Sequence, residues 1–178
     1  ISAFMLAKRF GYDRESKIFL EYYLSAEEAG KISNNTNGYF WRNRWFKPKQ
    51  KEEVRVYYST RGALKTYIHQ IPEDASGDSL TLGNALNAAQ FFLVGTMGID
   101  IKDWELIESK TKKLKNRWDH EFEWKEKSFN IKESNHILTV KVQGDQIGYY
   151  NERIKLPETW KLKYEKIRSK NNLLSTLG

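Results

Sequence analysis

The feature that most constrains this chain is an internal repeat: short strings from its first half return in its second half in the same order. The matched strings are Phe10-Gly11-Tyr12-Asp13 with Met97-Gly98-Ile99-Asp100, Asn43-Arg44-Trp45 with Asn116-Arg117-Trp118, and Ile71-Pro72-Glu73 with Leu156-Pro157-Glu158. Self-similarity in a fixed order indicates a duplicated structural unit. We therefore predict two similar units that pair their sheets or helices to complete their cores.

Hydrophobic periodicity predicts that each unit is one helix followed by a four-stranded antiparallel meander, which is an α+β fold. In the first half we expect a helix over residues 2–10, strands over 39–46, 53–59 and 63–71, and an extra short helix over about 25–34. The pattern of residues 17–24 allows a strand or a helix, and the counterpart at residues 104–109 favours a strand. In the second half we expect a helix over residues 82–97 and strands over 104–112, 117–127, 136–143 and 147–156. A helix that packs across such a sheet buries one face and leaves the other in water.

Turn and capping residues set the expected boundaries. Gly11 and Gly98 would each end a helix, and Ser25 with Glu28 forms a capping box that opens the extra helix. The polar stretch Pro72–Asp78 is the clearest linker. We expect the first repeat over residues 1–74, the second over 79–158, and a C-terminal helix or juxtamembrane segment over 159–178.

Composition excludes several classes of function. The chain has 178 residues, enough to bury a core, and it has no Cys, which rules out disulfides, a thiol nucleophile and thiolate metal sites. The net charge is +7, but the 30 basic residues are interspersed with 23 acidic ones. A dedicated nucleic-acid binder more often gathers its positive charge on one face, so we expect no nucleic-acid partner.

Residues able to carry out catalysis are sparse. The only histidines are His69, His120 and His136, and none lies at the spacing of a zinc motif. Asp119 precedes His120 directly, but neighbouring side chains of a strand point to opposite faces, so Asp119 cannot readily orient the imidazole. Gly-rich phosphate loops and nucleophile elbows are also missing from the sequence. We therefore expect no catalytic residue, no metal site and no cofactor.

What remains is a concentration of aromatic and basic side chains around the repeated Asn-Arg-Trp. The candidate partner-binding residues are Arg44, Trp45, Arg117, Trp118, Asp119, His120 and Trp124. Trp, Tyr and Arg contribute interface energy out of proportion to their number, so these strands could form a face that binds a peptide or protein segment. The alternative is structural: pleated strands that bury their aromatics and expose their charges.

Longer strings add a resemblance to a known family. They are residues 44–56, residues 69–73, Asp119-His120-Glu121-Phe122-Glu123-Trp124, Val142-Gln143-Gly144-Asp145 and Leu156-Pro157-Glu158-Thr159-Trp160. Together they resemble the soluble extramembrane region of certain bacterial CPBP-family intramembrane proteases, relatives of the CAAX prenyl endopeptidase. The order of elements is also similar to PepSY-like and cystatin-like units, which often accompany or inhibit proteases.

The resemblance implies a non-catalytic part of a membrane protein. The family keeps its catalytic residues in transmembrane helices, within Glu-Glu-x-x-x-Arg and His-containing motifs. Here Glu27-Glu28 and Glu52-Glu53 lack the required Arg, so no catalytic residue carries over. The chain begins at Ile1 rather than Met, and we expect it to be a fragment whose parent supplies the membrane segments.

Three functions follow as expectations. The first is a sensor or substrate-docking domain on the extracytoplasmic, periplasmic face of a bacterial membrane, with a peptide, a protein segment or the parent's own membrane domain as partner. The second is a free-standing PepSY-like periplasmic binder or protease inhibitor. The third is a soluble enzyme with an unrecognised site. Apolar spans of about 20 residues on both sides of this stretch would favour the first over the second.

Overall fold

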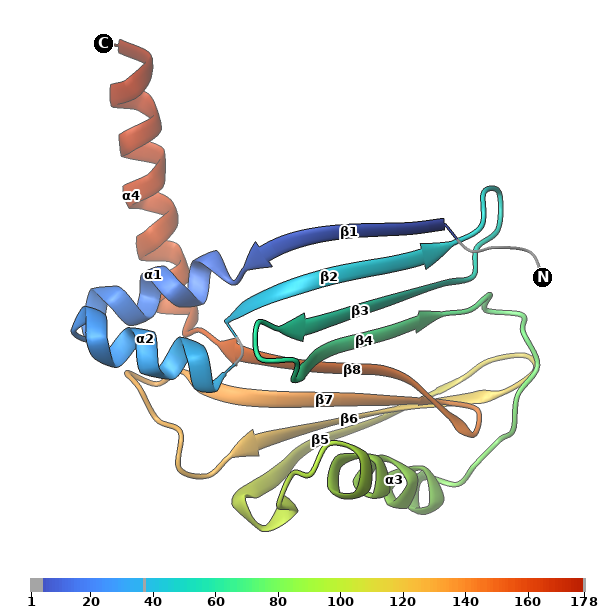
Figure 1. Cartoon of the computed structure of the whole chain (residues 1–178). Coiled ribbons are helices and arrows are strands. Elements are labelled where there is room, and N and C mark those ends of the chain that lie inside the picture. The colour runs from blue at the N-terminus through green and yellow to red at the C-terminus, as the bar shows by residue number, and fades with distance from the viewer. Residues whose placement is uncertain (1–4, 37, 178) are drawn as a thin grey trace.

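The computed structural model describes residues 5–36 and 38–177, and it confirms the predicted α+β class. One antiparallel sheet of eight strands runs in the order β1-β2-β3-β4-β8-β7-β6-β5 (Figure 1). The strands are β1 (Met5–Tyr12), β2 (Tyr39–Phe46), β3 (Glu53–Ser59), β4 (Leu64–Gln70), β5 (Trp104–Lys113), β6 (Trp118–Glu126), β7 (Asn135–Gln143) and β8 (Gln146–Lys155). The helices are α1 (Arg14–Tyr23), α2 (Ala26–Asn35), α3 (Leu82–Phe91) and α4 (Glu158–Leu177), with a π turn η1 (Phe92–Thr96) and a 3-10 turn η2 (Ile101–Asp103).

The sheet consists of two four-stranded meanders that meet along their last strands. We call β1–β4 the first meander and β5–β8 the second meander. They join where β4 pairs with β8, through Thr66 with Asn151, Tyr67 with Tyr150 and Ile68 with Tyr149. The strand order therefore reads the same from either end once β1 is matched with β5 and β4 with β8. The two halves share a single sheet.

The second half follows the prediction closely. Thr81 caps α3 by accepting a hydrogen bond from the backbone N–H of Asn84, and Gly98, with a φ of 66°, follows the end of η1. Helix α3 lies on β6 and β7. The main core lies between them and consists of Ala85, Ala89, Leu93, Phe122, Trp124, Leu138, Val140, Val142 and Tyr150, all at most 1% exposed.

The start of the first half differs from the prediction. Residues 5–12 form strand β1 rather than the end of a helix, while residues 1–4 lie outside the described residues. Gly11 does not stop a helix; the ring of Phe40 lies over it, and a Cβ there would be 2.8 Å from that ring. Residues 17–24, predicted as a strand, belong mostly to α1, which Asp13 caps through the N–H of Ser16. The expectation that a helix over residues 2–10 matches the helix over residues 82–97 is therefore wrong.

The predicted extra helix is confirmed as α2, with both hydrogen bonds of the Ser25–Glu28 capping box in place. Helices α1 and α2 are inserted between β1 and β2 and lie at one end of the sheet, where α4 also begins (Figure 1). A second core forms there from Phe19, Leu20, Ala29, Ile154, Leu156 and Trp160. Beyond this core, α4 projects away from the rest of the molecule (Figure 1).

Candidate functional site

The second Asn-Arg-Trp string fixes the linker between the two halves. Arg117 is 3% exposed; its Nε donates to Asp119 at 2.8 Å, and its Nη1 donates to the carbonyls of Pro72 at 2.9 Å and Ala75 at 2.8 Å. The Asn116 side chain donates to another linker carbonyl, that of Asp74, at 2.6 Å. Arg117 and Asp119 are thus committed to contacts within the chain, and they hold the segment that the sequence identifies as a linker.

Two other candidates on β6 belong to the main core. Trp124 is 1% exposed within the core beneath α3. His120 is also 1% exposed; its Nε2 lies 2.9 Å from the carbonyl oxygen of Leu80, and its Nδ1 lies 3.0 Å from the hydroxyl of Thr111. A carbonyl can only accept, so Nε2 carries a proton and donates. His120 therefore fixes the segment that leads into α3, and Trp124 packs beneath that helix.

The remaining candidates lie at the surface. Trp118 is half-buried, with the ammonium of Lys113 4.2 Å from its ring centre. Arg44 is exposed and binds Glu53 with its Nε 2.7 Å from the carboxylate. Trp45 is half-buried and, as the next residue in β2, points to the opposite side of the sheet from Arg44. Arg44 and Trp45 therefore cannot act on one ligand from the same face.

Trp45 belongs to a larger apolar surface that the sequence did not identify. Phe10 pairs with Trp41 and Trp41 with Tyr58, and along the same strands Trp45 pairs with Val54. Paired residues of an antiparallel sheet share a face. We call this surface the open aromatic face, and its members are Phe10, Trp41, Trp45, Val54, Val56 and Tyr58. Phe10 is 48% exposed and packs edge-on against Trp41 at 5.1 Å, while the other members are half-buried.

The open aromatic face lies on the same side of the sheet as the surface covered by α3. The register runs from Val56 to Tyr67, from Tyr67 to Tyr150, from Tyr150 to Val140 and from Val140 to Phe122. In the second meander this side is covered by α3, whereas no helix of the described chain crosses the first meander (Figure 1). This side of the sheet is therefore covered by α3 in the second meander, whereas among the described residues only the end of the first meander, at Tyr12 and Tyr39, lies against helices, α1 and α2.

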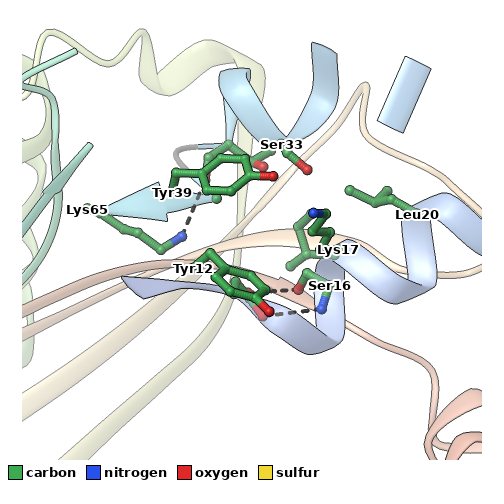
Figure 2. Close-up of a pocket in the computed structure, with 11 residues that line it drawn as sticks. Tyr12, Ser16, Lys17, Leu20, Ser33, Tyr39 and Lys65 are labelled. Atoms are coloured by element: carbon green, nitrogen blue, oxygen red, sulfur yellow. Dashed lines mark hydrogen bonds between the residues drawn. The ribbon is translucent and has the colours of Figure 1, made fainter. Parts of the chain in front are cut away.

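A small enclosed pocket surrounds Lys65 on β4. Figure 2 shows Lys65 between Tyr12 and Tyr39 of the strands, with Ser16, Lys17 and Leu20 of α1 and Ser33 of α2 around it. Its ammonium donates to the carbonyl of Thr36 at 3.3 Å. Burial lowers the pKa of Lys65, and the negative charges of Glu152 and Asp13 oppose that shift. The cavity measures about 10 Å³, which is room for about one water molecule and excludes an organic substrate.

A buried histidine lies between two carboxylates near this end of the sheet. His136 Nδ1 is 2.7 Å from Glu126 and its Nε2 is 3.1 Å from Glu152. Burial by itself lowers the pKa of His136, but hydrogen bonds and charge from Glu152 and then Glu126 outweigh it, so the pKa is raised overall. The arrangement favours a protonated imidazolium that joins three neighbouring strands.

Within residues 5–36 and 38–177, no group of three or more His, Cys, Asp or Glu side chains is placed to hold a metal ion. None of the helices in that part of the chain is both long and apolar enough to cross a membrane. Comparisons with protein-family models, with curated proteins and with solved structures found no match to this chain.

Proposed function

We propose that this chain is a non-catalytic docking module that binds a segment of a partner protein on its open aromatic face. The observation that carries this proposal is the unequal cover of one sheet. The same side packs against α3 in the second meander and is left open in the first. Contiguous exposed apolar surface with aromatic members is typical of an interaction site.

The chemistry of the face suits a protein partner. Trp41, Trp45 and Tyr58 offer large, stiff side chains that bury much area with little loss of conformational entropy. Asn43 of β2 lies between Trp41 and Trp45 on this face, so the surface is not uniformly apolar. Aromatic anchors beside polar positions are the usual composition of a hot spot.

The second meander supplies a template for the occupant. Helix α3 presents Ala85 and Ala89 to the sheet and η1 adds Leu93, and these small and apolar side chains allow a close approach. We propose that an amphipathic helix of the partner lies across β2 and β3 in a comparable way. Such helix-in-groove recognition uses apolar residues spaced three and four apart.

The resemblance to CPBP-type membrane proteases supports a location at the extracytoplasmic face of a bacterial membrane, as part of a larger membrane protein. On this proposal the partner segment belongs to a protease substrate or to the parent's own membrane domain. Fractionation of the full-length protein from its host tests the location: the docking module of a membrane protein stays with the membranes after an alkaline wash, whereas a free-standing periplasmic binder is released.

The docking surface is tested by photo-crosslinking in the full-length protein. A photoreactive residue at Tyr58 should give a discrete adduct, and the partner peptide identified by mass spectrometry should have an amphipathic helical pattern. The same group at the exposed turn residue Arg61 serves as the positional control. Equal adducts at both positions, or none at Tyr58, would contradict the proposal.

A pair of tryptophan variants then measures the contribution of the face. Trp45→Ala should weaken partner binding by about 1–2 kcal/mol and leave the melting temperature nearly unchanged. Trp118→Ala is the matched control, since it removes a half-buried tryptophan from the other copy of Asn-Arg-Trp. If Trp45→Ala loses much stability but binds normally once folded, the tryptophan is a packing residue and the docking role is wrong.

A further inference from the structure

We infer that the free edge of β1 binds an extended acidic segment in which acidic and apolar residues alternate. This inference deepens the proposed function and rests on it, because it states the chemistry of a partner that the docking module receives. It draws on a surface separate from most of the open aromatic face: the opposite side of the sheet and the outer edge of its first strand.

Three arginines converge at this edge. Arg9 of β1 pairs with Arg42 of β2, so both side chains lie on the same face of the sheet, and Arg14 opens α1 just beyond β1. Together with Gly11 and Phe40 they line an open hollow of about 440 Å³. We call this feature the arginine hollow.

The hollow has a flat, firm floor. Gly11 has no side chain, and the ring of Phe40 occupies the space over it. Phe40 stacks on Tyr57 at 5.4 Å with an interplanar angle of 8°, and the guanidinium of Arg42 lies 5.9 Å from the centre of the Tyr57 ring. This stack supports Arg42, and because Phe40 fills the space over Gly11, the floor of the hollow is closed at that point.

The arginines of the hollow differ from the other strand arginines in their partners. Arg44 and Arg55 both bind Glu53, and Arg153 binds Glu123 at 2.6 Å. Arg9, Arg14 and Arg42, in contrast, form no ion pair with any residue of the described ranges 5–36 and 38–177. Like charges directly opposite each other on neighbouring strands are destabilising. An arrangement that sets Arg9 against Arg42 is relieved when a negative group binds between them.

The position of the hollow suggests a strand as its ligand. Strand β1 is the first in the sheet, and no strand of residues 5–36 or 38–177 pairs with its outer row of backbone N–H and C=O groups, so this row can pair with an added strand. Its register with β2 runs unbroken through all eight residues. The opposite edge strand, β5, has a bulge between Leu106 and Glu108, and its Lys110 and Lys112 are paired with Glu108 and Glu73. Of the two edge strands, β1 is therefore the one that is better suited to pair with an added strand.

The side chains of β1 specify the pattern of the added strand. On the face that carries the arginines, a carboxylate opposite Arg9 would lie beside Arg9 and Arg42, and one opposite Gly11 would lie towards Arg14. On the other face Phe10 and Tyr12 are 48% and 46% exposed, and apolar side chains opposite them would cover these rings. Successive side chains of a strand alternate between faces, so the partner should alternate Glu or Asp with apolar residues.

The test uses fluorescence anisotropy with the intact chain and labelled peptides. A peptide of alternating Glu and Val should bind, and added salt should weaken the binding. A peptide of alternating Gln and Val should bind at least about tenfold more weakly, because two charge-assisted pairs are lost. A third peptide has the composition of the first but keeps its Glu and Val residues in separate blocks, and it should also bind weakly. Equal binding of either control peptide would overturn the inference.

Variants locate the site. The double variant Arg9→Gln, Arg42→Gln should raise the Kd for the alternating peptide about tenfold, while Arg168→Gln, which removes an exposed arginine of α4, should leave it nearly unchanged. Arg9, Arg42 and Arg168 all contact solvent, so these substitutions should leave the fold intact. The circular dichroism melting curve of each variant checks this. The charge reversal Arg9→Glu should abolish binding as a second, independent check.

Two outcomes distinguish this inference from lipid binding and from the proposed function on which it rests. If vesicles containing phosphatidylserine bind the chain, lose binding in the Arg9→Gln, Arg42→Gln variant, and the alternating peptide does not bind, the hollow binds lipid headgroups and the peptide inference is wrong. If the peptide fails but Tyr58 still crosslinks to a partner, the docking module stands and only the chemistry assigned to the β1 edge fails.

Discussion

Arg117 contacts both the strand that follows it and the segment that leads from the first half to the second. Its guanidinium is buried between the carboxylate of Asp119 and the backbone carbonyl oxygens of Pro72 and Ala75. Gly77 packs so closely that a Cβ there would lie 3.2 Å from the Arg117 side chain. One residue thus determines where the second half begins relative to the first.

Replacing Arg117 should therefore destabilise the whole molecule. Arg117→Ala leaves the Asp119 carboxylate and the linker carbonyls without their donor, and we expect a loss of about 3–5 kcal/mol in the free energy of unfolding. Arg117→Lys should recover little of it, because an ammonium cannot reproduce the planar fork. Urea denaturation measures the loss, with Arg168→Ala as the exposed control. An unchanged urea midpoint would show that the contacts of Arg117 do not stabilise the fold.

His136 makes stability depend on pH. Its pKa is raised in the folded chain above its ordinary value of 6.5, although burial alone acts in the other direction. A raised pKa means that the folded state holds the proton more tightly than the unfolded state. The resulting stabilisation is complete below pH 6.5 and is lost as the pH rises through the raised pKa.

The variant His136→Asn isolates this contribution. The stability gap between the native chain and the variant should be widest below pH 6.5 and should narrow at higher pH. Urea titrations at a series of pH values measure the gap. A gap that stays constant with pH would mean that the histidine stabilises by packing alone.

At the scale of elements, α4 depends on one aromatic cluster at its base. Trp160 is 4% exposed and contacts Phe19 at 5.4 Å and Tyr22 at 4.9 Å between ring centres. Leu162, two residues further on, is 59% exposed. The start of α4 is therefore bound to α1, through Trp160 and through Lys163, which donates to the Tyr22 hydroxyl at 2.7 Å.

Trp160→Ala should release α4 from the molecule. We expect a loss of about 3–5 kcal/mol in unfolding free energy, as for other large-to-small changes in a core. Leu162→Ala should cost less than about 0.5 kcal/mol, because that side chain is at the surface. Hydrogen exchange should show faster exchange in α4 of the Trp160 variant only. Equal exchange in both variants would place the anchor of α4 elsewhere.

The sequence predicted the elements unevenly, for a physical reason. From residue 39 onwards, turn residues and alternation located the strands to within one or two positions. In α1 the helical stripe of Ser16, Phe19, Leu20 and Tyr23 and the Asp13 cap were present, but the many aromatic residues favoured a strand. Strand β1 was missed because its apolar residues do not alternate cleanly with polar ones.

The candidate site could be predicted only in part. The alternation of residue types placed Trp45 and Trp124 in strands. It could not show that α3 covers Trp124 and leaves Trp45 at the surface. That depends on packing between elements far apart in the chain. Arg9, Arg14 and Arg42 come together through strand pairing across an inserted pair of helices, so no local motif signals them.

At the scale of the whole molecule, the two meanders carry unequal amounts of buried surface. Strands β6, β7 and β8 contribute most of the fully buried side chains, whereas β2 and β3 are largely half-buried. Regions with less buried apolar surface open more readily. Strands of one sheet can therefore differ in local stability even though they are hydrogen-bonded to each other.

Hydrogen exchange of the free chain should show this difference. We expect the backbone amides of β1, β2 and β3 to exchange faster than those of β6, β7 and β8, with the β4–β8 pairing as the boundary. Binding of a partner to the first meander should slow exchange there and leave the second meander unchanged. Uniform exchange across all eight strands would mean that the sheet opens as one unit.

The palindromic strand order also bears on self-association. Within the molecule, β4 and β8 hold equivalent places in the two meanders, and their pairing leaves neither strand with a free edge. Pairing of β1 in one molecule with β5 in the next would instead leave a free edge at each end, so it would repeat and build a filament. Strand β1 carries positive charge through Arg9, so two β1 edges repel each other. On β5, Lys110 and Lys112 are paired with Glu108 and Glu73, so this edge offers Arg9 little negative charge, and an acidic strand from another protein is the better match.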